Sequence, residues 1–219
     1  MDFISLGRVS FDEARRKQEE AVEKIAFEGA PERVYLLEHP HVFTLGRGGE
    51  ASNLLARQDW ADHPIQLVRI NRGGDITYHG PGQLVGYPHL DLRSRGRDVH
   101  RYLRGLEEVL IRTAARWGVH AFRRAGLTGV WTDRGKLASI GVGVRHWVTL
   151  HGFALNACTD LRYFQLINPC GMEGCRVTSF SHLLERHVTA PELIPALTLA
   201  FREVFLSSTK NKGSVGSRQ

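Results

Sequence analysis

Apolar residues recur at helical spacing in three stretches of the chain, and each stretch follows a helix-start signal. Ser10 with Glu13 and Thr189 with Glu192 form capping boxes at the start of the first and third stretches. Asp98 is an N-cap candidate for the second, whose leucines repeat every three or four positions. We therefore predict helices over residues 10–29, 99–117 and 189–205.

Short runs rich in β-branched and aromatic residues separate these helices and predict strands. The runs cover residues 33–38, 42–46, 65–70, 130–133, 136–144 and 147–156. Residues 75–92 hold two more such runs, divided by the turn Gly80-Pro81-Gly82. Clustered strands flanked by helices, without a repeat or a long linker, predict an α+β fold in one domain over residues 1–206. Residues 207–219, rich in Ser, Lys and Gly, are predicted to be a disordered basic tail.

Composition narrows the class of protein. Apolar residues make up 42% of the chain and charged residues 24%, which is typical of a globular protein. We find neither a secretory signal nor an apolar run of membrane-spanning length, and three cysteines do not make a disulfide framework, so we expect a cytoplasmic protein. The net charge is +6, and three of the basic residues that contribute to it lie in 207–219. The remaining charge slightly favours an acidic protein partner and does not indicate nucleic acid.

A glycine-rich segment, residues 72–83, is the first candidate for a binding site. Its sequence, RGGDITYHGPGQ, concentrates glycine and proline where a strand would otherwise continue, which lets backbone amides approach a ligand. It lacks the ending of a phosphate-binding loop and the spacing of a dinucleotide fingerprint. An ordinary loop is the alternative interpretation.

Two later segments, residues 135–143 and 150–156, alternate small and apolar residues. Such strands could leave a shallow apolar slot beside Lys136, of the kind an acyl chain needs. They could equally be plain core strands in which glycine relieves crowding.

One lysine and one cysteine are candidates for chemistry. Lys136 is the only lysine between Lys24 and Lys210 in a chain that otherwise uses arginine, and only a lysine amine can readily lose its proton. Cys170 lies in a Pro-Cys-Gly turn that would expose it, whereas Cys158 and Cys175 are expected to be buried and inert. A reactive Cys170 would need a nearby cation. Neither paired cysteine and histidine spacings for zinc nor a G-x-S-x-G hydrolase elbow occurs, so we expect no metal.

Together these segments resemble the lipoyl(octanoyl) transferase family of lipoate biosynthesis. The resemblance runs over residues 8–205, with its motifs in order: EHP at 38–40, FTLG at 43–46, RGGDITYHGPGQLVGYP at 72–88, Lys136 with SIG at 139–141, HGFALN at 151–156, PCG at 169–171 and VTS at 177–179. Several long motifs in order are more specific than any one of them. Cys175 is an additional cysteine close to the last of these motifs.

The resemblance implies a fold like that of biotin and lipoate ligases, a curved mixed sheet flanked by helices. It implies transfer of an octanoyl group from octanoyl-acyl carrier protein to a lysine of lipoyl domains, including those of 2-oxoacid dehydrogenase complexes and the glycine cleavage H protein, without ATP, metal or other cofactor. Cys170 would carry the acyl thioester, and Lys136 would lower its pKa and exchange protons with it. The substrate pocket would be lined by Arg72, Gly73, Gly74, Asp75, Ile76, Thr77, Tyr78, His79, Ser139, Ile140, Gly141, Gly152, Phe153 and Ala154.

Two rival functions stay open from the sequence. An ATP-dependent lipoate or biotin ligase of the same fold shares the glycine-rich region but needs no nucleophilic cysteine. A non-catalytic module could retain the acyl pocket without the chemistry. The presence of both Cys170 and Lys136 favours the transferase over both alternatives.

Overall fold

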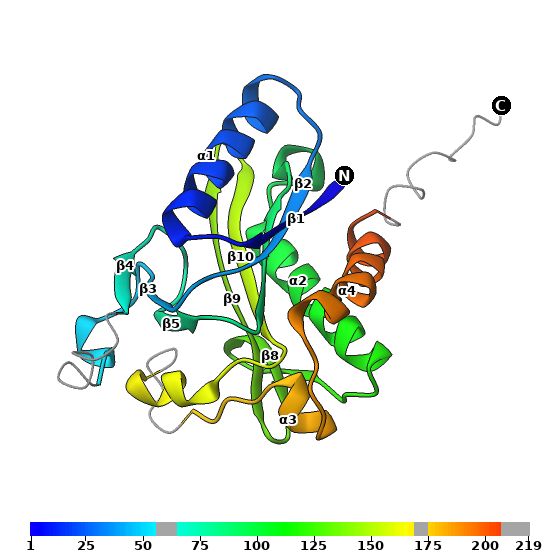
Figure 1. Ribbon diagram of the computed structural model, residues 1–219. Helices are drawn as coiled ribbons and strands as arrows, with labels where there is room; N and C mark the ends of the chain where they lie inside the picture. The colour runs from blue at the N-terminus through cyan, green and yellow to red at the C-terminus, as the bar shows by residue number, and fades with distance from the viewer. Residues whose placement is uncertain (56–64, 169–174, 207–219) are drawn as a thin grey trace.

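Two β-sheets of unequal size form the framework of the computed structural model, which describes residues 1–55, 65–168 and 175–206 (Figure 1). The larger sheet has seven strands in the order β1 (Asp2–Arg8), β2 (Arg33–Glu38), β6 (Gln83–His89), β10 (Val148–Asn156), β9 (Gly135–Arg145), β8 (Leu127–Thr132) and β7 (Phe122–Arg124). The smaller sheet has three, in the order β4 (Gln66–Arg69), β3 (Val42–Leu45) and β5 (Ile76–His79). The predicted α+β class with a mixed sheet is confirmed.

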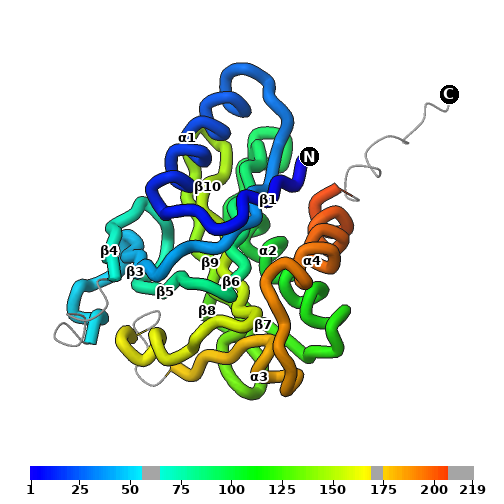
Figure 2. Tube along the Cα trace, in the orientation of Figure 1, coloured from blue at the N-terminus to red at the C-terminus, as the bar shows by residue number. Residues whose placement is uncertain are grey.

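The larger sheet is mixed because its first two strands are joined by a helical crossover. Strand β1 pairs in parallel with β2, and helix α1 (Phe11–Phe27) connects them. The other neighbouring strands of this sheet pair antiparallel, and β9 and β10 form a long hairpin at its centre. The tube in Figure 2 shows this hairpin starting behind α1 and extending through the centre of the molecule.

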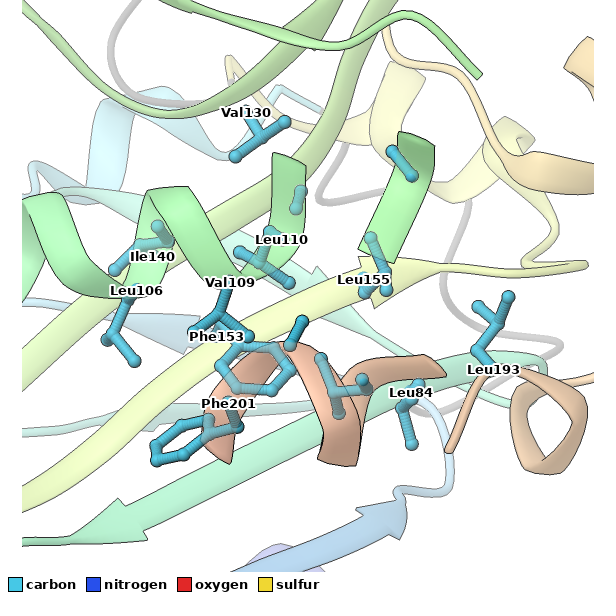
Figure 3. Packing of buried hydrophobic residues seen from close by; sticks show 14 of the residues in the cluster. Leu84, Leu106, Val109, Leu110, Val130, Ile140, Phe153, Leu155, Leu193 and Phe201 are labelled. Atoms are coloured by element: carbon cyan, nitrogen blue, oxygen red, sulfur yellow. The ribbon is translucent and has the colours of Figure 1, made fainter. Parts of the chain in front are cut away.

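Helices α2 (Val99–Arg116) and α4 (Ala190–Phe205) cover one face of the larger sheet. Figure 3 shows Leu106 and Leu110 of α2 and Phe201 of α4 packed around Phe153 and Leu155 of β10. Helix α1 packs on the opposite face, against β6 and β10. The remaining helical segments are short: η1 (Ala51–Asn53), η2 (Leu92–Arg95), η3 (Leu161–Leu166) and α3 (Phe180–Leu184).

The helix-start signals are confirmed as caps. The Ser10 hydroxyl accepts from the Glu13 amide, and the Asp98 carboxylate accepts from the Arg101 amide. Thr189 and Glu192 form the expected capping box. These caps satisfy amide groups that a helix start leaves without intrahelical partners, which explains why the three boundaries were readable.

Strands β1 and β7 and helix α3 were not predicted. Strand β1 lies at one edge of the larger sheet and β7 at the other, so each has only one neighbour. Strand β7 has three residues and α3 five, too few for periodicity to register.

The smaller sheet has an apolar cluster of its own, formed by Phe43, Leu45, Leu54, Ile65, Ile76, Tyr78, Phe164 and Ile167. This cluster joins β3 and β5 to the chain at 161–167, just before the predicted nucleophile. No helix in the described ranges is long and apolar enough to cross a membrane. The tail predicted at 207–219 lies outside the described residues.

Candidate active site

A cavity opens between the two sheets. Strands β9 and β10 form its floor, and β5 with the preceding loop forms a wall. It is lined by Phe11, Ile70, Arg72, Gly74, Asp75, Ile76, Thr77, His79, Tyr87, Lys136, Ser139, Ile140, Gly141, His151, Gly152, Phe153 and Ala154. All three segments predicted to line a pocket therefore meet here, together with Lys136.

Two residues of the predicted pocket do not line this cavity. Alternation along β5 directs Tyr78 to the far side of the smaller sheet, where its ring stacks on Tyr163 at 4.8 Å between centroids. Its hydroxyl lies 2.7 Å from His41 Nδ1, and burial raises the pKa of Tyr78. Gly73 instead joins the loop to β9, because its amide donates to the Val142 carbonyl at 2.9 Å.

Arg72 crosses from the loop to the smaller sheet. Its guanidinium donates to the Thr44 carbonyl at 2.9 Å, to Thr44 Oγ1 at 3.0 Å and to the Gly73 carbonyl at 3.0 Å. A Cβ at Gly141 would lie 2.8 Å from Arg72 Cδ. The space that Gly141 leaves is therefore occupied by Arg72, and the groove expected there is partly filled by this side chain.

Crowding explains another glycine of the floor. A Cβ at Gly152 would lie 2.2 Å from the Gly86 carbonyl oxygen of the neighbouring strand and 2.6 Å from Pro88. Gly152 therefore permits β6 and β10 to approach each other, as the alternative interpretation of these segments expected.

Lys136 is 2% exposed and lies at the start of β9. Its Nζ is 5.2 Å from the centroid of the Trp131 ring, a distance at which the ring attracts a cation. The Lys136 backbone accepts from the Thr178 amide at 3.0 Å and donates to the Arg176 carbonyl at 2.8 Å. Lys136 is thus joined directly to the chain that follows the predicted nucleophile.

Cys170 itself lies outside the described residues, and so do Pro169 and Gly171. The chain on its N-terminal side is held by the smaller sheet's flank: the Asn168 amide donates to the Asn53 carbonyl at 2.7 Å.

Two histidines, His79 and His151, line the cavity, and His39 lies beside His79 with 5.8 Å between the ring centroids. Burial lowers the pKa of His79 to about 3 and that of His39 to about 4. Burial, with a contribution from Arg72, lowers the pKa of His151 to about 3. These three imidazoles are therefore neutral at ordinary pH, and among the described residues Arg72 and Lys136 are the basic side chains that line the cavity.

His151 has an unusual backbone. Its φ of 57° lies in the left-handed region, although it belongs to a strand. Its amide donates to Gln18 Oε1 of helix α1 at 2.8 Å. Helix α1 therefore supports the strand at the point where it enters the cavity.

Phe11, Ile70, Tyr87 and His151 line the cavity but were not predicted as site residues. Tyr87 and His151 do belong to motifs that carried the resemblance, so that signal was available. Phe11 and Ile70 gave no local signal.

The other two cysteines are half-buried, so the expectation that both are buried was wrong. Burial and the nearby Glu38 carboxylate raise the pKa of Cys158, which favours its protonated, unreactive form. Within the described ranges, no three His, Cys, Asp or Glu side chains gather as a metal site would require.

A profile of the lipoyl protein ligase A/B catalytic domain matches residues 12–202. The chain belongs to this family.

Relatives within the family are similar over most of their length. An octanoyltransferase of Syntrophotalea carbinolica is 52% identical over 93% of this chain and 94% of its own. An octanoyltransferase of Geotalea uraniireducens is 58% identical over 82% of this chain and 81% of its own.

Solved structures of ligases share the family's fold at low identity. A bipartite lipoate protein ligase from Thermoplasma acidophilum superposes with a TM-score of 0.73 at 18% identity, covering 94% of this chain and 83% of its own. A biotin protein ligase from Aquifex aeolicus gives 0.54 at 10% identity over 96% and 71%. These likenesses confirm the expected ligase-like fold and carry no further information on chemistry.

Proposed function

We propose that this protein is an ATP-independent octanoyltransferase that acts in the first step of endogenous lipoate biosynthesis. It moves an octanoyl group from octanoyl-acyl carrier protein to a lysine of a lipoyl domain, through a thioester on Cys170. The observation that carries the proposal is the long, high-identity match to octanoyltransferases. The buried Lys136 in the cavity floor supports the chemistry, because two backbone hydrogen bonds join it directly to the chain that follows Cys170.

In the first half-reaction, the Cys170 thiolate attacks the carbonyl carbon of the octanoyl thioester. A carbon–sulfur bond to Cys170 forms, and the bond to the carrier's sulfur breaks. The departing thiolate takes a proton from the Lys136 ammonium, so the carrier leaves as a thiol. This exchange of one thioester for another is nearly neutral in energy, which is why no ATP is needed.

In the second half-reaction, the lysine amine of the lipoyl domain attacks the acyl-Cys170 carbonyl. An amide forms, the bond to the Cys170 sulfur breaks, and the neutral Lys136 amine takes the proton that the attacking nitrogen loses. Lys136 is then an ammonium beside a Cys170 thiolate, ready for the next cycle. One amine thus acts as acid and then as base.

The cavity suits an acyl chain with a polar end. Phe11, Ile70 and Ala154 offer apolar surface, while Arg72 and Lys136 supply positive charge where an acyl oxygen becomes anionic. We assign substrate contact to the predicted lining residues found here, from Arg72 through His79 without Gly73 and Tyr78, and to 139–141 and 152–154. We place the reaction in the cytoplasm, with acyl carrier protein and lipoyl domains of 2-oxoacid dehydrogenase complexes and H protein as partners.

Intact-protein mass spectrometry tests this proposal. Mixing the protein with octanoyl-acyl carrier protein, without ATP, should add one octanoyl group, and an added lipoyl domain should remove it. Cys170→Ser should lose the adduct, whereas the control Cys158→Ser should keep it.

Each of the other outcomes would support a different function or a different nucleophile. Absence of an adduct, followed by lipoyl-domain acylation only when ATP and free octanoate are supplied, would assign the protein to the ligases. No transfer under either condition would favour the binding module. An adduct that persists in Cys170→Ser would refute the proposed nucleophile.

A further inference from the structure

A chain of buried hydrogen bonds runs from the wall of the cavity to its floor. It begins at Arg72, whose guanidinium donates to Thr44 Oγ1 at 3.0 Å. Thr44 Oγ1 lies 3.2 Å from His79 Nε2, and His79 Nδ1 lies 2.8 Å from Gln83 Oε1. All four side chains are buried.

The chain of hydrogen bonds then continues to the floor. Gln83 Nε2 donates to Asn156 Oδ1 at 2.9 Å, and Asn156 Nδ2 donates to the Thr178 carbonyl at 3.0 Å. The Thr178 amide donates to the Lys136 carbonyl at 3.0 Å. The network therefore connects the Arg72 guanidinium with the backbone of Lys136.

Two backbone carbonyls determine how the amide groups in this network point. A carbonyl oxygen only accepts, so Asn156 must present its nitrogen to Thr178 and its oxygen to Gln83. Gln83 Nε2 also donates to the Tyr78 carbonyl at 3.2 Å. Gln83 must therefore present its nitrogen to these two acceptors and its oxygen to His79.

The orientation of Gln83 fixes the protons of His79. Since Gln83 Oε1 only accepts, His79 Nδ1 must carry a proton and donate it. The imidazole is neutral, because burial lowers the pKa of His79 to about 3 and the neighbouring His39, Arg72 and His151 oppose a positive charge. Nε2 is then an acceptor, and the Thr44 hydroxyl donates to it while accepting from Arg72.

We infer that His79 is a positioning residue, held as the neutral tautomer with its proton on Nδ1, which orients the Thr44 hydroxyl and through it the Arg72 guanidinium, and that it transfers no proton. Every donor in the network points the same way, from Arg72 toward Lys136. Hydrogen bonds aligned head to tail polarise one another, so the arrangement strengthens each member. A histidine in a cavity is ordinarily the first candidate for acid–base chemistry, but both nitrogens of this one are used within the protein.

The tautomer can be measured in the resting protein by long-range ¹H–¹⁵N correlation of the histidine rings, with His79→Gln used to assign the signals. We expect His79 Nδ1 at the shift of a protonated ring nitrogen and Nε2 at that of an unprotonated one, unchanged from about pH 5 to about pH 8. A proton on Nε2, or a titration of His79 within that range, would overturn the inference. This test needs no substrate and is independent of the proposed function.

The positioning effect on Arg72 rests on the proposed function and has its own test. Thr44→Val removes the hydroxyl but keeps the shape, and kcat/KM for octanoyl transfer should fall on the order of ten-fold, since one hydrogen bond to a charged group is lost. The fall should be equal at every pH, and the Nε2 signal of His79 should shift. Thr44→Ser should restore that signal.

Thr113→Val is the matched control, because it removes an equally buried hydroxyl that bonds to the Val109 carbonyl within α2. It should leave both kcat/KM and the His79 signals unchanged. Loss of a limb of the pH–rate profile in His79→Gln would instead identify His79 as an acid–base group. Absence of transfer in the wild-type protein would refute the proposed function while leaving the tautomer result standing.

Discussion

The helix-covered face of the larger sheet and the cavity between the two sheets are both buried but are held in different ways. Under α2 and α4, Leu106, Leu110, Leu155 and Phe201 have no exposed surface and make only apolar contacts. At the cavity, Arg72, His79 and Lys136 are also buried, and hydrogen bonds link Arg72 and His79 through Thr44. Burial alone therefore does not distinguish a core from a site; what differs is whether the buried atoms need partners.

The comparison predicts that substitutions in these two regions change different properties of the protein. Apolar burial contributes stability in proportion to area, whereas a polar network fixes orientation and contributes less net free energy. Substitutions under the helices should change the free energy of unfolding, and substitutions in the cavity should change transfer. The predictions below run from the largest expected effect to the smallest.

Replacing Lys136 with Met should have the largest effect. Met retains the volume of the buried side chain but removes the amine, so octanoyl transfer should fall by roughly 10²- to 10⁴-fold. The free energy of unfolding should fall by only about 0.5–2 kcal/mol, since the packing is kept and the attraction between Nζ and the Trp131 ring is lost. Steady-state transfer and urea denaturation measure the two properties. Lys24→Met, at an exposed position near the end of α1, is the control, and near-normal transfer by Lys136→Met would contradict the assigned role.

On the apolar face, Phe201→Ala should show the opposite pattern. Removing a fully buried ring leaves a cavity and should lower the free energy of unfolding by about 3–5 kcal/mol. Transfer per folded molecule should remain normal. Leu199→Ala, on the same helix but 51% exposed, should change stability by less than about 0.5 kcal/mol. A large loss of specific activity in Phe201→Ala would show that the faces are coupled.

Gly141→Ala tests the contact between the cavity floor and Arg72. The new Cβ would meet Arg72 Cδ at 2.8 Å and the Gly73 carbonyl at 3.0 Å, so the guanidinium must move. We expect kcat/KM to fall on the order of ten-fold, with a stability loss of about 1–3 kcal/mol from overpacking. Gly48→Ala, where the nearest atom is 3.7 Å away, is the control and should behave as the wild type.

The smallest effect is the contribution of one buried histidine to the pH dependence of stability. The pKa values of His39 and His89 are lowered to about 4 and those of His79 and His151 to about 3, from 6.5. The unfolded chain therefore takes up protons near pH 6.5 that the folded chain refuses. Stability should be complete above pH 6.5 and fall as pH decreases toward 4.

Each such histidine contributes a slope of about 1.4 kcal/mol per pH unit. Urea denaturation at several pH values between about 7 and about 5 should show that His89→Gln reduces the slope by this amount. The exposed His187 is the control position. An unchanged slope in His89→Gln would show that this histidine is protonated equally in both states.

Local signals in the sequence predicted the parts of the fold that depend on local physics. Capping residues such as Ser10 and Asp98 act within one turn of their own helix, so their spacing is visible in the chain. The segments that line the cavity were found because glycine and small residues were concentrated in them. Their convergence was expected only from the family resemblance.

Contacts between distant positions could not be read in this way. Gln18 meets His151 only because α1 crosses the sheet there, and the alternation of β5 separates Tyr78 from its neighbours Thr77 and His79. The network from Arg72 to Thr178 depends on the relative placement of both sheets. Nothing in the spacing of these residues along the chain determines it.

The smaller sheet, with a cluster of its own, has a consequence for motion. A unit with few buried apolar residues opens by local unfolding more readily than the rest of a protein, at a lower free energy. Amide protons of β3 and β5 should therefore exchange with solvent sooner than those of β9 and β10, which lie inside the seven-stranded sheet. The wall that carries Thr44 and His79 belongs to the smaller sheet, whose amides should exchange faster. The floor beside Lys136 belongs to the larger sheet, whose amides should exchange more slowly. The cavity therefore lies between a unit that unfolds locally more often and one that does so less often.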